Sequence, residues 1–449
     1  MSIIPMRRIR FLFWVVRELT GKYKRSLLIG FLIGLAVAFA IGRFSITLSS
    51  QLFTKTVRVG IIGEFTPTTL PIKIQQKISN GLTQLSADGS PQASLALSWE
   101  STESGRLFLF HLRDGLTWHN EKSVSAKDIN YNIRGATLNP IDERTLEVHL
   151  STAYSPFPVL VAKPIFQAGL RGFGPYKVSA IRLKGDKVDY IKLVPFKDDT
   201  LPVTEYRFYR TEALATLAYK RGDVDILEDM SSAQALSQWG QTTVIEETNF
   251  QRIVTLFFNQ KKQLLMEKGI RQALGYAVGE LPGERAYSPF SKLSWAYTDK
   301  VKKYDSDIVQ AKKLFSASNV GSQSATLTLS TFPSYLEVAN SIAQSWTDLG
   351  LPTTVRVISS VTDDYDVLLS AAELPPDPDQ YPFWHSTQTQ TNITSYVNVK
   401  IDKLLEDGRQ ETDPEKRKLI YGDFQRRLTD DAPAIFLYHP KTYTIKRGK

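Results

Sequence analysis

The sequence of 449 residues contains no cysteine, which excludes disulfide bonds, thiolate metal ligands and cysteine nucleophiles. It also lacks a Gly-x-Ser-x-Gly nucleophile motif, a phosphate-binding loop and a dinucleotide-binding fingerprint. Histidine is scarce, and the five histidines do not have the spacing of a zinc-binding motif: His111, His119, His149, His385 and His439. We therefore expect no enzyme activity, no metal site and no cofactor.

The body of the chain has no excess of positive charge, although the whole sequence carries a net charge of +9. Residues 1–58 contain ten basic residues and one acidic residue, so residues 59–449 hold 45 of each sign. A protein that binds nucleic acid needs a basic surface to neutralise phosphates. The balanced body argues against nucleic acid as a partner.

One long apolar run follows the basic N-terminal segment. Ser26–Gly42 carries no charge and, extended to Ile46, is long enough to cross the ~30 Å hydrocarbon core of a bilayer. Seven of the ten basic residues precede the run, so we expect a cytoplasmic segment 1–25, a transmembrane helix 26–46 and an exported body. Two alternatives remain, namely a signal peptide cleaved at a small residue such as Ala38, and a helix buried in the body.

Strand and helix patterns alternate along the body, which indicates an α/β fold. Residues 325–330, 335–349 and 354–358 read as strand, helix and strand, which implies a parallel strand pair. Ser125 and Asp128 form a capping pair that predicts a helix reaching Ile133. Further strands are predicted at 57–62, 107–112, 145–150, 254–258, 366–369 and 432–438, and further helices at 70–82, 212–219, 269–277, 402–411 and 414–428.

Four stretches of the sequence resemble one protein family. The longest is Pro91–Ile133, which contains Leu107-Phe-Leu-Phe-His-Leu-Arg113, Asp114-Gly115 and Trp118-His119. The others are Gly172–Val178, Arg221–Ile226 and the pair Val254–Asn259 with Gly269–Ala277. Over residues 55–445 the chain resembles the extracytoplasmic solute-binding proteins of peptide-type ABC importers, the family-5 oligopeptide, dipeptide and nickel-binding class.

This resemblance implies a periplasmic-binding-protein-like type II fold (cluster C), with two main lobes joined by a hinge and a small extra domain. The implied divisions are lobe I at 55–82, 169–247 and 432–449, lobe II at 83–168 and lobe III at 248–431. Many family members are tethered by a lipid-modified cysteine, which this chain lacks. The apolar segment 26–46 would replace that tether.

The resemblance also implies where a ligand binds. Family members pair the main chain of an extended ligand with the strand that corresponds to residues 366–374. Peptide binders often carry Trp and, three residues later, Asp to bind the ligand's amino terminus, and these positions here are Ala371 and Leu374. We expect the following residues to contact the ligand: Glu64, Asn259, Ser370, Ala371, Glu373, Tyr381, Trp384 and His385. The nearby Asp377-Pro378-Asp379 does not fit a calcium loop, and we expect it to be a solvated turn.

The expected function is that of a monomeric substrate-binding subunit. It would bind peptides or peptide-like solutes outside the cytoplasmic membrane and deliver them to a permease and an ATPase. Two alternatives remain. One is an anchored ligand sensor or scaffold that keeps the fold without transport, and the other is an exported hydrolase, which the lack of a nucleophile–base pair disfavours.

Overall fold

The computed structural model describes residues 55–318, 326–361 and 364–448, with scattered positions between 14 and 39. The chain divides into two compact units, Met1–Thr56 and Val57–Lys449. Most of the predicted cytoplasmic segment 1–25 and most of the predicted anchor at 26–46 lie outside the described residues. Among the residues that are described, no helix combines the length and the apolar composition needed to span a bilayer.

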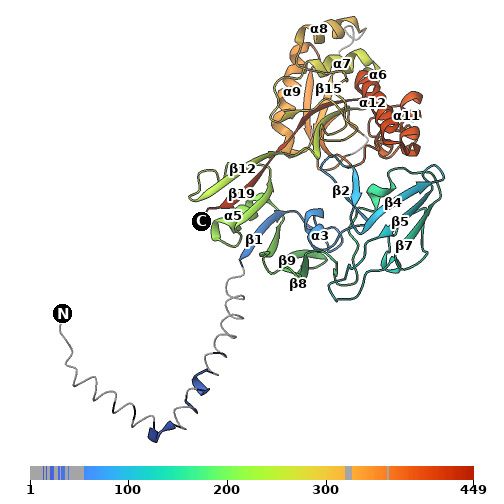
Figure 1. The fold of residues 1–449 in the computed structure, drawn as a ribbon. Coiled ribbons are helices and arrows are strands. Elements are labelled where there is room, and N and C mark those ends of the chain that lie inside the picture. The colour runs from blue at the N-terminus through green and yellow to red at the C-terminus, as the bar shows by residue number, and fades with distance from the viewer. Residues whose placement is uncertain are drawn as a thin grey trace, which may run out of the picture. The chain divides into compact units, whose positions relative to one another are not determined.

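The body contains three main sheets, and we call each sheet with the elements that pack on it a lobe, numbered I, II and III (Figure 1). The sheet of lobe I has seven strands in the order β12-β19-β11-β1-β10-β9-β8. Its strands are β1 (Thr56–Ile62), β8 (Tyr176–Lys184), β9 (Lys187–Pro195), β10 (Val203–Tyr209), β11 (Ile226–Met230), β12 (Thr242–Thr248) and β19 (Lys441–Arg447), and its helices are α3 (Ile72–Ile78) and α5 (Glu212–Arg221). The helix predicted at 212–219 is α5, which extends to Arg221 and ends at Gly222, whose φ of 81° favours glycine.

Lobe II is built on a four-stranded sheet in the order β4-β5-β7-β6, with a separate two-stranded hairpin β2-β3. Alternating side chains of β5, including Phe108 and Phe110, are buried in its core. The elements are β2 (Thr83–Leu85), β3 (Pro91–Ala93), β4 (Ala96–Thr102), β5 (Leu107–Leu112), η1 (Ala126–Asp128), β6 (Ala136–Pro140), β7 (Thr145–Leu150) and α4 (Phe157–Leu160).

The helix predicted from Ser125 to Ile133 is wrong. The backbone N–H of Ser125 does donate to Asp128 Oδ2 at 2.8 Å, but only one 3₁₀ turn follows and Ile129 is already extended. Ile129 is buried in the core of lobe II, and the Tyr131 hydroxyl donates to the Val161 carbonyl at 2.7 Å. These tertiary contacts override the local helix pattern.

Lobe III has a six-stranded sheet in the order β14-β18-β13-β17-β15-β16, covered by helices on both faces. The predicted strand–helix–strand unit is present, and β15 pairs with β16 in parallel. The strands are β13 (Arg252–Phe258), β14 (Glu284–Arg285), β15 (Leu327–Thr331), β16 (Thr353–Val357), β17 (Val367–Glu373) and β18 (Ala434–His439). The helices are α6 (Gln263–Met266), α7 (Lys268–Tyr276), α8 (Ile308–Ala317), η3 (Pro333–Tyr335), α9 (Leu336–Leu349), α10 (Tyr381–Trp384), α11 (Val399–Gln410) and α12 (Pro414–Asp431).

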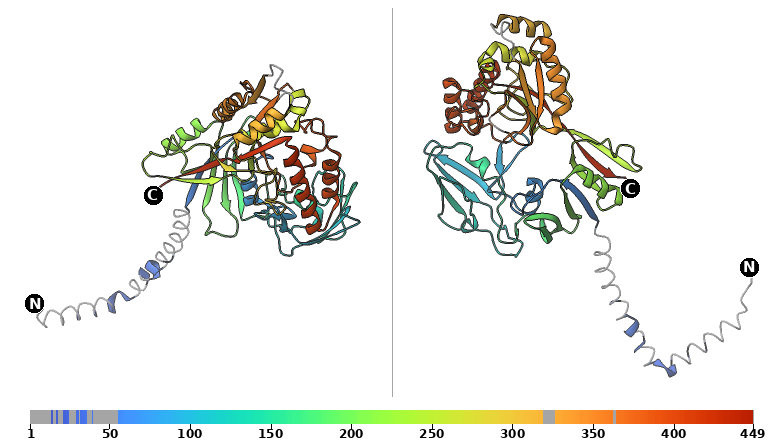
Figure 2. Two further views of the ribbon diagram at one scale, coloured as in Figure 1. Left: turned by 90° about the horizontal axis from the view of Figure 1, so that it is seen from above. Right: turned by 180° about the vertical axis from the view of Figure 1, so that it is seen from behind.

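Alternation along the strands divides lobe III into two cores. Val254 and Leu256 of β13 pack against α7, α8 and α9 on one face of the sheet. Ile253 and Phe257 of the same strand pack on the other face, where α11 and α12 lie side by side (Figure 2). The sheet is therefore buried on both sides, and a cavity on one face is separated from the other core.

The chain passes between lobes I and III twice, from β12 to β13 and from β18 to β19. The backbone N–H of Asn249, in the first crossing, donates to the carbonyl of Pro440 in the second at 2.8 Å. The sheet topology moves one predicted boundary, because β18 pairs with β13. Residues 434–439 belong to the sheet of lobe III, and the chain returns to lobe I at Pro440 instead of 432.

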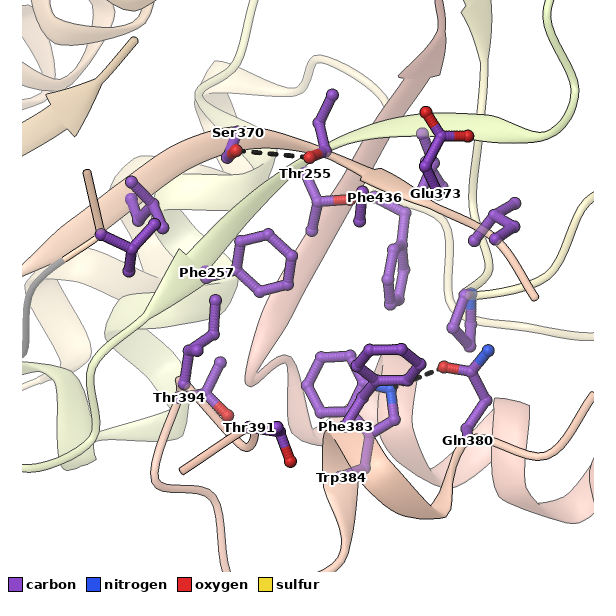
Figure 3. A pocket seen from close by; sticks show the side chains of 18 of the residues that line it. Thr255, Phe257, Ser370, Glu373, Gln380, Phe383, Trp384, Thr391, Thr394 and Phe436 are labelled. Atoms are coloured by element: carbon purple, nitrogen blue, oxygen red, sulfur yellow. Dashed lines mark hydrogen bonds between the residues drawn. The ribbon is translucent and has the colours of Figure 1, made fainter. Parts of the chain in front are cut away.

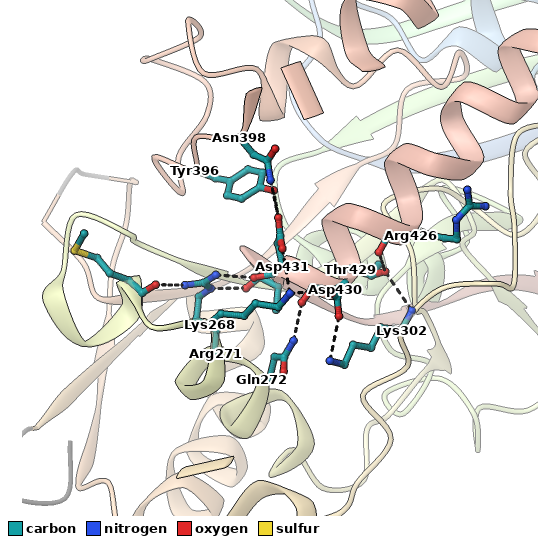
Figure 4. A network of polar contacts seen from close by, with 12 residues as sticks. Lys268, Arg271, Gln272, Lys302, Tyr396, Asn398, Arg426, Thr429, Asp430 and Asp431 are labelled. Carbon is teal, nitrogen blue, oxygen red and sulfur yellow. Dashed lines mark hydrogen bonds and ion pairs between the residues drawn. The ribbon is translucent and has the colours of Figure 1, made fainter. Parts of the chain in front are cut away.

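A polar network fixes the C-terminal end of α12 (Figure 4). Arg271 on α7 is buried and its guanidinium donates to the carbonyls of Asp431 at 2.6 Å and Ala432 at 2.9 Å. Ala432 has a φ of 50°, so the chain turns there in the left-handed region. Lys268 contributes ion pairs to the carboxylates of Asp430 and Asp431. The Arg271 motif that carried part of the family resemblance therefore has an architectural role.

Candidate ligand-binding site

A cavity of about 370 Å³ lies against one face of the lobe III sheet (Figure 3). One wall consists of side chains from neighbouring strands, including Thr255 and Phe257 of β13 and Phe436 of β18. The opposite wall consists of α10 and of the segment that follows it as far as Thr394. The cavity is therefore formed by parts of the chain that are far apart in sequence.

Aromatic side chains dominate the interior of this cavity. Trp384 is 3% exposed, stacks on Phe257 with ring centroids 6.5 Å apart, and meets Phe436 edge-on at 6.2 Å. Its indole Nε1 donates to Gln380 Oε1 at 3.1 Å, which fixes the ring. Phe383 also lines the cavity but remains 41% exposed, so a ligand would cover this ring.

The edge of β17 beside the cavity is only partly paired. β13 pairs with β17 over its whole length, from Arg252 opposite Glu373 to Phe258 opposite Val367. β15 pairs with the other edge only at Val367–Leu369. In the described part of the chain, no strand therefore pairs with that edge at Ser370–Glu373, and such an edge is able to accept an additional strand.

A second cavity, of about 380 Å³, adjoins the first and lies between lobes. It is lined by Ile72 and Gln76 of α3 and by the turn of the β2-β3 hairpin, together with residues of lobe III. The two cavities share four lining residues, Pro289, Glu373, Leu374 and Pro375. The end of β17 thus connects an aromatic cavity with a space that lobes I, II and III share.

Four of the residues predicted to contact a ligand line the aromatic cavity, namely Ser370, Ala371, Glu373 and Trp384. The Glu373 carboxylate is not isolated, because the Arg252 Nε donates to its Oε1 at 2.7 Å. Both side chains remain largely accessible, with exposed fractions of 63% for Glu373 and 43% for Arg252. Glu373 therefore enters the site as half of an ion pair.

Tyr381 and His385 lie behind the cavity wall. Their rings stack with centroids 4.0 Å apart, and the Arg409 guanidinium lies 4.3 Å from the Tyr381 ring. His385 is 4% exposed, and its Nε2 is 3.3 Å from Glu406 Oε1. Neither residue is among the described residues that line the two cavities. Both instead hold α10 against α11.

Glu64 and Asn259 lie elsewhere. Glu64 accepts from Arg210 Nε at 2.8 Å in a separate surface cavity on lobe I. Asn259 is buried, and its Nδ2 donates to the Tyr365 carbonyl at 2.8 Å while its Oδ1 accepts from the Lys261 backbone at 3.1 Å. Asn259 therefore shapes the turn after β13.

The sequence analysis missed much of the cavity lining. Thr255 and Phe257 share a face by alternation, so a face assignment for the predicted strand 254–258 would have grouped them, and Ile253 continues the same face one residue before that strand. No local pattern indicates that Phe436, at the end of the chain, meets Trp384. Within residues 55–318, 326–361 and 364–448, no group of three or more His, Asp or Glu side chains is placed to hold a metal ion.

Comparisons with known proteins identify relatives of this chain. The family model "Bacterial extracellular solute-binding proteins, family 5 Middle" matches residues 90–393. A probable D,D-dipeptide-binding periplasmic protein of Escherichia coli, DdpA, is 23% identical over 82% of this chain and 84% of its own length. The oligopeptide-binding protein AppA of Bacillus subtilis is also 23% identical, over 82% of each chain.

Solved structures share the fold. The ABC transporter substrate-binding protein CtaP of Listeria monocytogenes has a TM-score of 0.75 at 22% identity, over 87% of this chain and 94% of that one. The AppA structure from Bacillus subtilis, in complex with a nonapeptide, has a TM-score of 0.65 at 18% identity, over 88% of this chain and 95% of that one.

Proposed function

This chain belongs to the bacterial extracellular solute-binding proteins of family 5, and on that premise we propose that it binds peptides or peptide-like solutes between lobes I and III and delivers them to an ABC permease. The observation that carries the choice of solute is the unpaired edge of β17 at Ser370–Glu373, which opens beside two connected cavities. An extended main chain offers the donors and acceptors that such an edge requires.

The proposed protein binds and releases its solute without making or breaking covalent bonds. Main-chain hydrogen bonds along β17 contribute about 0.5–1.5 kcal/mol each, and burial of ligand side chains adds about 25 cal/mol for each Å² of apolar surface. Lobes I and III are linked by only two crossings, so a ligand that contacts both shifts the population toward the closed form. The named ligands of DdpA and AppA, which are peptides, support the same class of solute.

Among the described residues that line the aromatic cavity, none offers a carboxylate dedicated to a free amino terminus. The positions that correspond to the family's Trp and Asp are Ala371 and Leu374, and the neighbouring Glu373 is bound to Arg252. We therefore expect a free peptide and its N-acetylated form to bind with affinities that agree within about two-fold, since an exposed ion pair contributes little. A strong preference for the free amine contradicts this assignment of positions.

Purification of the full-length chain in detergent, followed by native mass spectrometry, tests the proposed solute class. We expect peptides to be retained from a defined mixture and released intact on denaturation. In titration calorimetry, methylation of a single central amide nitrogen of a bound peptide should weaken binding about two- to ten-fold, because one main-chain donor is lost. Failure to retain any peptide, or hydrolysis of the mixture, overturns the proposal.

The proposal also includes a membrane anchor at the N-terminal end of the chain. The segment 26–46 anchors a monomer in the cytoplasmic membrane, with residues 1–25 inside and the body outside. In intact cells, added protease should digest the body while a tag before residue 1 survives. A body recovered in the soluble fraction without residues 26–46 would show cleavage instead, and uptake of a labelled peptide that does not depend on this chain would favour a sensor or scaffold.

A further inference from the structure

We propose that the aromatic cavity of lobe III selects solutes that carry one bulky apolar side chain next to the main chain bound at Ser370–Glu373. This inference rests on the proposed function, because it takes the ligand to be peptide-like. It names the class of residue that the solute must contain at one position.

The cavity is already shaped to receive an apolar ring or branched chain. Trp384 is fixed by its bond to Gln380 and by its contacts with Phe257 and Phe436, so these walls are ordered without a ligand (Figure 3). Phe383, at 41% exposure, provides apolar surface that only a ligand would cover. A preformed apolar site binds with little cost in ordering its own side chains.

The polar side chains of the lining are largely occupied by the protein itself. Gln380 Oε1 accepts from Trp384, and the Thr394 hydroxyl donates to Asn392 Oδ1 at 2.9 Å. The Thr391 hydroxyl donates to the carbonyl of Pro382. These groups are already bonded within the protein, and among the described polar side chains of the lining Thr255 Oγ1 is buried without a hydrogen-bond partner. Apolar contact is therefore the main source of recognition.

A charged ligand side chain would find no free counter-charge among the described residues of the lining. Glu373 is the only charged side chain among the described residues that line the cavity, and it is paired with Arg252. Burying an ammonium or carboxylate against Trp384, Phe257 and Phe436 would remove its hydration without replacing it. Lysine and glutamate at this position should therefore be disfavoured.

The register of β17 links the cavity to one position of the ligand. Ser370 and Ala372 of β17, and Leu374 directly after it, share one face by alternation and line the cavity together with Ala371 and Glu373. A ligand strand added at this edge also alternates, so every second side chain points to this face. The second cavity adjoins the end of β17, and its lining includes Gln76 and Asp88, so it is more tolerant of polar ligand groups.

Calorimetry with a peptide series Ala-Ala-X-Ala, N-acetylated and amidated, tests the proposal on the full-length chain. We expect X = Phe or Leu to bind about ten- to hundred-fold more tightly than X = Ala, from burial of one apolar side chain, and X = Lys or Glu to bind more weakly than Ala. Equal affinities across the series overturn the selectivity and leave the proposed function standing. Absence of binding by every peptide counts against the proposed function itself.

Two substitutions in the cavity, with one control elsewhere, test whether the preference for an apolar side chain arises there. Ala372→Phe fills the cavity and should reduce the Phe-to-Ala affinity ratio to about two-fold or less. The matched control is Ala180→Phe, the same substitution at an exposed position on β8 of lobe I, and it should leave the ratio unchanged. If Ala372→Phe fails to fold, Phe383→Ala at the half-exposed ring should still lower the ratio several-fold. A ratio that survives both cavity variants overturns the assignment.

Discussion

At the level of single residues, the two aspartates that follow β17 differ from the expectation of a solvated turn. Asp377 is 6% exposed and Asp379 is 8% exposed. Two guanidinium nitrogens of Arg417 contact the Asp377 carboxylate at 2.8 and 2.5 Å, and Arg417 itself is buried. The expectation was wrong because the partner that permits burial lies 40 residues along the chain.

We predict that Asp377→Asn lowers the free energy of unfolding by about 3–5 kcal/mol, because it leaves the Arg417 charge buried without its counter-charge. Urea denaturation monitored by circular dichroism measures the change. The control is Asp186→Asn, whose ion pair with Lys187 is exposed and whose loss should cost less than about 1 kcal/mol. Similar costs for the two substitutions contradict the prediction.

At the level of elements, strong periodicity made most of the fold predictable. The helix at 335–349 and the parallel strands beside it follow from local patterns that tertiary packing reinforces. The helix at 125–133 failed because contacts of Ile129 and Tyr131 with distant parts of lobe II favoured extended backbone. The boundary at 432 was misplaced since the pairing of β18 with β13 spans about 180 residues and leaves no local trace.

The candidate site was predictable only along one segment. The family resemblance located Ser370, Ala371 and Glu373 on β17 and Trp384 on α10. It did not distinguish side chains that line the cavity from those that support it, such as His385. That distinction depends on which face of α10 meets the sheet, and the sheet is assembled from distant strands.

The contribution of His439, at the crossing between β18 and β19, to the free energy of unfolding should depend on pH. Its ring contacts Phe250 of the other crossing at 5.2 Å, and its Nδ1 donates to the Arg252 carbonyl at 2.8 Å. Burial lowers the pKa of His439 below 6.5, although the Arg252 carbonyl and Glu284 oppose the shift and Lys292 adds to it. The folded protein therefore favours the neutral ring, and this contribution to stability is fully present above pH 6.5.

We predict that the free energy of unfolding falls as the pH decreases below 6.5, by at most about 1.4 kcal/mol per pH unit from this group. Glutamine keeps a donor without a titrating ring, so His439→Gln should reduce the fall. Urea unfolding of both chains between about pH 8 and about pH 5 gives the comparison. His119, whose pKa is also lowered by burial, is present in both and cancels. Identical pH profiles contradict the prediction.

At the level of the whole body, lobe II contacts lobe III directly. The Tyr154 hydroxyl of lobe II donates to Asp379 Oδ2 of lobe III at 3.2 Å, and Arg409 Nε donates to the same oxygen at 3.0 Å. The backbone N–H of Ser155 donates to the Arg409 carbonyl at 2.7 Å. Burial raises the pKa of Asp379, which Arg409 opposes. We call this group of contacts the strut.

The strut should resist separation of lobe III from lobe II. We predict that Tyr154→Phe, which removes one hydrogen bond of about 0.5–1.5 kcal/mol, increases the separated population about two- to ten-fold. Spin labels at Glu103→Cys and Lys418→Cys, exposed positions on the two lobes, report the distance distribution, and the absence of native cysteine keeps labelling specific.

The matched control is Tyr287→Phe, which breaks a bond of the same kind, from the Tyr287 hydroxyl to Asp305 at 2.7 Å, within lobe III. It should leave the distance distribution unchanged. If Tyr154→Phe also leaves it unchanged, the hydroxyl does not hold the two lobes together.

The first and last strands of the body lie in one sheet, since β1 pairs with β11 and β11 pairs with β19. Any attachment at either end of the body therefore pulls on lobe I alone. A protein immobilised on a sensor chip through an affinity tag placed after β19 would be held by lobe I, with lobe III not attached to the chip. A fluorescent reporter fused at that end would stay with lobe I. A fluorescence measurement of the distance between lobes therefore needs its second dye on lobe III.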